Sequence, residues 1–168
     1  MIKHAPITHS RALLAALALG AVAAASSAAS AQDAQETDGQ RTITLDAGFE
    51  TDPTTLDLIS GGDFAASDKA EGCVGFIAEG PDLRLTFSAN DMANALPLYI
   101  TAQSDQDTTL VIKAPDGKFY CSDDTVNGTD PVVVFGPAQD GEYDIWVGSF
   151  DQDLYHDATL SISELGVR

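Results

Sequence analysis

The segment Asp107–Phe150 constrains the fold more than any other part of the chain. It consists of short runs of β-branched and aromatic residues, broken by Pro-Asp-Gly and Asp-Gly. β-branched and aromatic side chains favour strands, whereas Gly, Asp and Pro favour the tight turns between them. Many short strands at this spacing are typical of an antiparallel β-sandwich, jelly-roll-like, rather than of a parallel sheet. We therefore predict an all-β fold.

The same pattern extends over most of the chain. In Glu142–Gly148, Tyr143, Ile145 and Val147 alternate with Asp144 and Trp146, which is the two-residue period of a strand. The glycine-rich segment Gly61–Gly72 is predicted to be a flexible loop. The predicted strands are Thr42–Asp46, Val74–Ala78, Leu83–Ser88, Leu98–Ala102, Thr108–Lys113, Phe119–Cys121, Val132–Phe135, Glu142–Gly148 and Ala158–Ser163.

The N-terminus carries the pattern of a secretory signal peptide. Lys3 and Arg11 precede the uncharged Ala/Leu run 12–25, and Ala29-Ser30-Ala31 is a small-residue cleavage sequence. We predict a signal peptide at residues 1–31, a disordered polar leader at residues 32–41, and a single β-sandwich domain at residues 42–168. The chain is therefore predicted to be exported, to the periplasm or the extracellular medium, with no membrane span after cleavage.

The charge of the chain excludes some classes of partner. The whole sequence holds 26 Asp plus Glu against 8 Lys plus Arg. Cleavage after Ala31 removes Lys3 and Arg11, so the mature chain would carry a formal charge of −20. Such a charge repels nucleic acid and anionic lipid, and we expect neither as a partner.

The two cysteines, Cys73 and Cys121, both follow the cleavage site. An exported protein with two cysteines most simply forms one disulfide. A metal site is the alternative, but two thiols without a neighbouring His or third Cys seldom suffice for one. We predict a Cys73–Cys121 disulfide.

Four short motifs resemble the bacterial pre-peptidase C-terminal domain. They are the strand Thr108–Ile112, the turn Pro115–Gly117, the acidic pair in Cys121–Asp124, and Gly141–Gly148 with its Gly-x-Tyr and terminal Val-Gly. The resemblance covers Leu98–Leu165. It implies a jelly-roll-like β-sandwich that is usually a non-catalytic appendage of secreted hydrolases, sometimes with bound calcium. The chain departs from that family pattern because no protease domain precedes the motifs.

Calcium prefers six to eight oxygen ligands, which carboxylates and backbone carbonyls of loops can supply. The sequence has acidic pairs at Asp105 and Asp107, at Asp123 and Asp124, and at Asp151 and Asp153. None of them matches the EF-hand pattern. We predict that Asp107, Asp123 and Asp124 form a candidate calcium site at one end of the sandwich; acidic loops that serve solubility alone are the alternative.

A ligand site at Trp146 is a further prediction. Trp146 is out of phase with Tyr143, Ile145 and Val147, so an inward-facing Tyr/Ile/Val set would place the indole on the outer face, where it could stack on sugar or peptide. The alternative is that Trp146 packs under a loop or lies in the core.

Catalysis has little support in the sequence. His156 is the single histidine after the signal peptide, and Ser149 lacks a nucleophile-elbow sequence. We predict no catalytic residues. The favoured function is a small exported, non-catalytic β-sandwich that binds an extracellular or periplasmic polymer, protein or surface through its end loops. A hydrolase that uses loop carboxylates and a purely structural or assembly domain are the alternatives.

Overall fold

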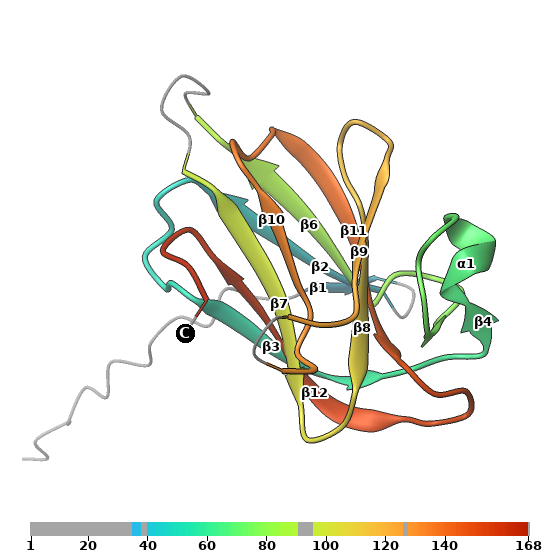
Figure 1. Cartoon of the computed structure of the whole chain (residues 1–168). Coiled ribbons are helices and arrows are strands. Elements are labelled where there is room, and N and C mark those ends of the chain that lie inside the picture. The colour runs from blue at the N-terminus through green and yellow to red at the C-terminus, as the bar shows by residue number, and fades with distance from the viewer. Residues whose placement is uncertain (1–34, 38–39, 91–95, 126–127, 168) are drawn as a thin grey trace, which may run out of the picture. The chain divides into compact units, whose positions relative to one another are not determined.

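The chain folds into two facing β-sheets (Figure 1). The structure is a computed structural model and describes residues 35–37, 40–90, 96–125 and 128–167. The first sheet, sheet A, has eight strands and the second, sheet B, has four. The predicted all-β sandwich is confirmed. The one-turn helix α1 (Ala66–Lys69) is too short to cross a membrane, and the described ranges contain no longer helix.

Sheet A runs in the order β1, β2, β6, β11, β5, β4, with β8 on the other edge of β11 and β9 beyond β8. Its strands are β1 (Gln35–Thr37), β2 (Gln40–Asp46), β4 (Phe64–Ala65), β5 (Phe76–Ile77), β6 (Leu83–Ser88), β8 (Thr108–Lys113), β9 (Phe119–Ser122) and β11 (Gly141–Ser149). Sheet B runs β10 (Val132–Phe135), β7 (Leu98–Ser104), β12 (His156–Ser163) and β3 (Thr54–Ser60).

The strand pairs are antiparallel with one exception, because β2 and β6 pair in parallel. The prediction of a wholly antiparallel sandwich is corrected at this point. A parallel pair needs a long crossover connection. Here the chain between Asp46 and Leu83 passes through β3 in sheet B and through β4, α1 and β5 before it returns to sheet A.

The predicted leader, residues 32–41, contains strand residues. Gln35–Thr37 forms β1 and pairs with the start of β2, which itself begins at Gln40. These residues differ from the disordered leader that their polar composition suggested, since backbone pairing at a sheet edge does not require apolar side chains. The predicted signal peptide, residues 1–31, lies outside the described residues and stays a prediction.

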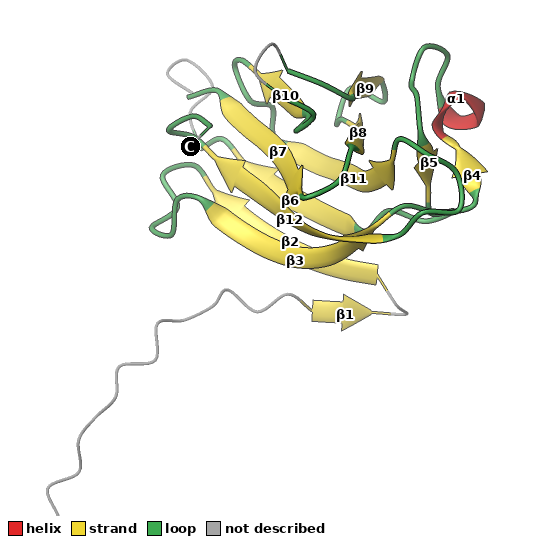
Figure 2. Cartoon of the chain, turned by 60° about the horizontal axis from the view of Figure 1, so that its bottom comes forward, coloured by secondary structure: helices red, strands yellow, loops and turns green. Residues whose placement is uncertain are grey.

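The main core lies between the two sheets (Figure 2). Its alternation is clearest in β11, where Tyr143, Ile145 and Val147 are fully buried against sheet B, as their two-residue spacing predicts. Leu85 on β6 and Leu160 on β12 enter the same core from the two sheets.

A second, smaller core lies on the opposite face of sheet A, over β8 and β11. The segment 62–78, which we call the cap, carries β4, α1 and β5 (Figure 1). Its two strands extend sheet A beside β11, and its buried side chains pack on that face. The prediction of a flexible loop at Gly61–Gly72 was therefore wrong. The helix of four residues is too short to show a helical apolar period, and it holds its place because Ala66, fully buried, packs into the second core.

Trp146 lies in this second core and not on an exposed surface. Its side chain is 4% exposed and packs with Val111, Ile77 and Cys73. The Lys69 Nζ lies 5.0 Å from the centre of the indole ring, a distance at which a cation attracts an aromatic face. The indole faces away from the main core, as predicted. The prediction of an exposed ligand platform was wrong, because Trp146 packs under the cap, as the alternative stated.

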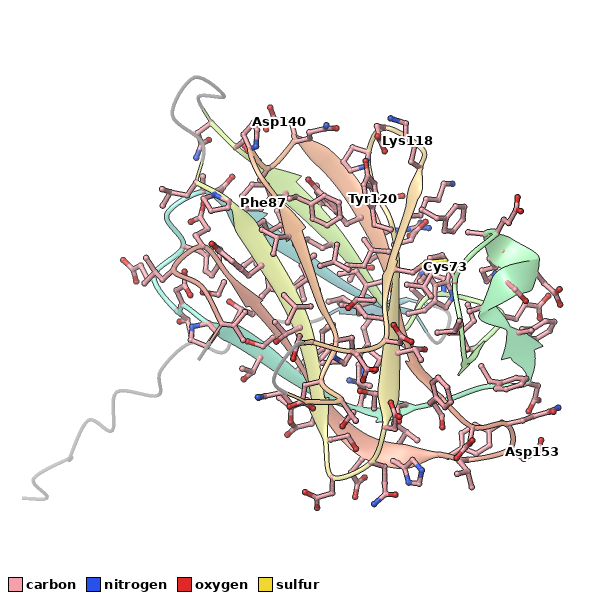
Figure 3. All side chains as sticks on the ribbon, viewed as in Figure 1. Cys73, Phe87, Lys118, Tyr120, Asp140 and Asp153 are labelled. Carbon is pink, nitrogen blue, oxygen red and sulfur yellow. A yellow bond between two sulfur atoms is a disulfide. The ribbon has the colours of Figure 1, made fainter. Side chains whose placement is uncertain are left out.

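The Cys73–Cys121 disulfide ties the cap to β9, and the prediction of this bond is confirmed. The two Cα atoms are 5.5 Å apart, and the bond closes a loop between residues 48 positions apart. Figure 3 shows Cys73 between the helix of the cap and the β8–β9 hairpin. Cys73 is buried in the second core, whereas Cys121 is exposed.

We predict that removal of the disulfide opens the cap before the sandwich unfolds. The Cys73→Ser, Cys121→Ser double variant should lose on the order of 4 kcal/mol of stability, because its unfolded chain is no longer cross-linked. Trp146 is the only tryptophan of the chain, so its emission should shift to the red when the cap opens. Emission spectra and thermal denaturation would measure the two effects, with Ser67→Ala on the cap as the control. An unshifted emission in the double variant would contradict this account.

Candidate functional site

Strand pairing brings acidic residues from three parts of the chain to one end of sheet A. β8 and β9 form a hairpin in which Leu110 lies opposite Ser122, so Asp107, before β8, and Asp123, after β9, are at the same end. β11 pairs with β8 on its other edge, with Ser149 opposite Thr108. The Phe150 N–H donates to the Asp107 carbonyl oxygen at 3.2 Å, which brings the start of the β11–β12 loop to this end as well. We call Asp107, Asp123, Asp124 and Asp151 the acidic rim.

Asp107 is the most constrained member of the rim. Its side chain is partly buried, and its Oδ1 is shielded from solvent without a hydrogen-bond partner among the described residues. Burial raises the pKa of Asp107 above its usual value, and the negative charges of Asp124, Asp123 and Asp151 raise it further. The four carboxyl groups therefore repel one another, and a positive charge placed among them would be stabilised.

The structure thus brings together all three residues of the predicted calcium site. It does not arrange them as a complete metal cage, since no three Asp, Glu, His or Cys side chains in the described part of the chain are gathered closely enough to hold one ion. Asp151 was missed as a partner of Asp107. Its contribution depends on the pairing of β11 with β8, which local sequence patterns do not reveal.

Asp116 does not belong to the acidic rim. Asp116, in the β8–β9 turn, accepts hydrogen bonds from the Lys118 N–H at 3.0 Å and the Tyr120 hydroxyl at 3.0 Å, and these bonds lower its pKa. Figure 3 shows Lys118 and Tyr120 at one end of the molecule and Asp153 at the other. Asp116 therefore belongs to the end opposite the loop that carries Asp153.

Ser149 and His156 do not form a catalytic pair. The Ser149 side chain is 1% exposed, and its hydroxyl makes no hydrogen bond to any described residue, His156 included. His156 begins β12 in sheet B, where its carbonyl oxygen accepts a hydrogen bond from the Ser60 hydroxyl at 3.2 Å. A serine nucleophile requires a base within hydrogen-bond reach, and this geometry does not provide one.

Asp82 is a second carboxyl group with a shifted pKa. It precedes β6, where its N–H donates to the Ile145 carbonyl at 2.9 Å and its Oδ2 accepts from the Val147 N–H at 2.8 Å. Burial raises the pKa of Asp82 from 3.8 to about 6, although the Val147 N–H and the charge of Arg41 act in the opposite direction. Asp82 thus fastens β6 to the middle of β11 and is a structural rather than a rim residue.

We predict that Asp82 makes the protein less stable as the pH rises from 4 to 6. The folded state holds the Asp82 proton up to a pH of about 6, whereas the unfolded state releases it near 3.8. The stabilisation that comes from holding this proton is therefore fully present below pH 3.8 and is lost above a pH of about 6. Asp82→Asn keeps an acceptor for the Val147 N–H, and it should flatten this slope and raise stability at pH 7 by up to about 3 kcal/mol. Urea unfolding at several pH values would test it.

The control for Asp82 is Asp68→Asn, which removes the same formal charge from an exposed position on the cap. If the stability of Asp82→Asn still fell between pH 4 and 6 as steeply as that of the unmodified chain, burial of Asp82 would not be the cause of this pH dependence.

Comparisons with known proteins give a similarity in structure. No protein-family model matches the chain, and no curated protein matches it. The fold is similar to a crystal structure of the pre-peptidase C-terminal domain of a collagenase from Bacillus anthracis. The two chains are 16% identical, the match covers 77% of this chain and 97% of the other, and the TM-score is 0.40.

Proposed function

We propose that the chain is a small exported, non-catalytic β-sandwich module that binds an extracellular or periplasmic polymer, protein or surface, and that its acidic rim takes a calcium ion. The observation that supports this function most is the convergence of four carboxyl groups from three separate segments on one end of a cross-linked frame. A disulfide fits an exported protein, because such bonds persist in oxidising compartments.

The frame suits a binding role because its loops are held at both ends. β11 is hydrogen-bonded to β6 on one edge and to β8 on the other, and the disulfide fixes the end of β9 from the side of the cap. The rim residues directly follow or precede these fixed strands. Loops that begin on rigid strands lose little conformational entropy when they bind a partner.

Calcium would bind at Asp107, with Asp123, Asp124 and Asp151 as the further candidate ligands. The unpartnered Oδ1 of Asp107 and the repulsion within the rim fit a hard cation, which accepts carboxylate oxygens as ligands. Asp124 is exposed and Asp123 is partly exposed, so their side chains have room to turn toward Asp107. The bound ion would supply positive charge, which stiffens the loops after β9 and β11.

We expect calcium to raise the melting temperature of the purified chain, and Asp107→Asn to abolish this shift. Without calcium, Asp107→Asn should be more stable than the unmodified chain, because the substitution relieves both the burial of a charge and the repulsion from Asp124. Calorimetry of chelator-treated protein, with and without millimolar calcium, would measure both effects.

Asp153→Asn is the matched control for this experiment. It removes one charge from the β11–β12 loop, and Asn tolerates the positive φ of 61° that Asp153 adopts. The calcium proposal fails if the unmodified chain shows no shift, or if Asp107→Asn shifts as much as Asp153→Asn.

Binding through the rim is tested by capture of exported components. The immobilised chain should retain a polymer or protein from a bacterial periplasmic or culture fraction, and Asp123→Asn with Asp124→Asn should release it, whereas Asp153→Asn should not. If the rim substitutions left retention unchanged, the end loops would not be part of the binding surface. Turnover of a hydrolase substrate, abolished by Asp123→Ala, would instead support an enzyme.

A further inference from the structure

The two sheets differ in what covers their outer faces. The cap packs on the outer face of sheet A over β8 and β11, whereas the outward side chains of sheet B, apart from the buried Thr101 and Ser163, are partly or fully exposed. One row crosses all four strands of sheet B: Val132, Thr101, Ser161 and Thr55 lie opposite one another in the strand register. Figure 2 shows the strands of sheet B as one continuous layer.

Two hollows on sheet B meet at Gln103. The first is lined by Tyr99, Val132 and Val134, and it has a volume of about 450 Å³. Val134 on the edge strand β10 is 50% exposed. The second hollow has a volume of about 530 Å³. Gln103 lines both, so the two hollows adjoin on sheet B, an apolar one at β10 and a second at β3 and β12; we call the pair the trough.

The second end of the trough is acidic and has little compensating charge. Asp57, Asp105 and Asp157 line it, and all three are exposed. None of the four strands of sheet B contains a Lys or an Arg. Arg41 reaches this end from β2, but it donates to the backbone carbonyl of Asp57 and not to its carboxylate. The ion pairs found among the described residues are made by Arg84 and Lys118, elsewhere on the molecule.

We propose that this trough docks an extended polypeptide segment that carries an apolar side chain at one position and a Lys or Arg further along. The apolar side chain would lie on Tyr99 and Val134, and the cation would meet Asp57 and Asp157. The proposal rests on the function as a binding module and gives the chemical class of its partner. A second copy of this chain does not fit, because two mature chains of charge −20 repel each other.

The strand register sets the length of that segment. Tyr99 and Asp57 are two strand spacings apart, about 10 Å, and their rows are offset by four residues along β7, about 13 Å. The diagonal is about 16 Å, which an extended peptide spans with about five residues. A peptide with Leu and Lys five positions apart therefore matches the trough, whereas adjacent Leu and Lys do not.

The test uses fluorescent peptides with Leu and Lys at either spacing, titrated with the purified full chain and followed by anisotropy. We expect the five-residue spacing to bind more tightly than the adjacent one. Asp57→Asn with Asp157→Asn should weaken the matched peptide by about tenfold or more at moderate salt. Asp68→Asn with Glu71→Gln, which removes equal charge from the cap, should leave its affinity unchanged.

A second variant tests the apolar end. Val134→Ser changes a half-exposed side chain, so the fold should persist, and it should weaken a Leu-bearing peptide but not the same peptide with Ala. Circular dichroism of each variant checks that the sandwich is intact.

Two results would overturn the docking proposal. They are no measurable peptide binding and an equal loss of peptide affinity in the cap control. If the peptides did not bind but capture through the acidic rim were retained, only the docking proposal for the trough would be wrong. If both peptide binding and capture were absent, the proposed function as a binding module would be wrong as well.

Discussion

β11 is buried on both faces and hydrogen-bonded on both edges, and the rest of the structure depends on that. Tyr143, Ile145 and Val147 enter the core between the sheets, whereas Trp146 enters the core beneath the cap. One strand is thus shared by two apolar cores. Because its edges pair with β6 and β8, it also fixes the register of sheet A. A shift of β11 by one residue would exchange the two sets of side chains and disrupt both cores.

The two surfaces to which we assign binding depend on this strand in different ways. The acidic rim lies at the end of β11 and of its partner β8, so the repulsion around Asp107 is held in place by backbone hydrogen bonds. The trough lies on sheet B, which meets β11 only through the main core. The cap covers only β8 and the middle of β11 on sheet A, and no such segment packs on the outer face of sheet B among the described residues. The excess of carboxylates on both surfaces favours cationic partners.

Patterns of neighbouring residues predicted the strand bounds and the disulfide, which depend on residues close in the sequence or on composition. The strands Leu83–Ser88, Thr108–Lys113 and Val132–Phe135 have the predicted bounds, because turn residues mark both ends of each. The disulfide followed from the presence of just two cysteines. What failed depends on contacts between distant segments. The parallel β2–β6 pair is one example, and the burial of Trp146 by a cap far away in the sequence is another. Asp107, Asp123 and Asp124 were predicted as a group, whereas Asp151 joins them only through the β8–β11 register.

Native-state hydrogen exchange of the oxidised chain, resolved by residue, tests the central position of β11 most directly. We expect the Ile145 and Val147 amides to exchange only by global unfolding and to be the slowest among the described residues. Amides of the cap, such as Ala66, should exchange faster, through local opening that leaves the sandwich folded. If the β11 amides exchanged as fast as those of the cap, β11 would not be the element that unites the two cores, and the account would be wrong.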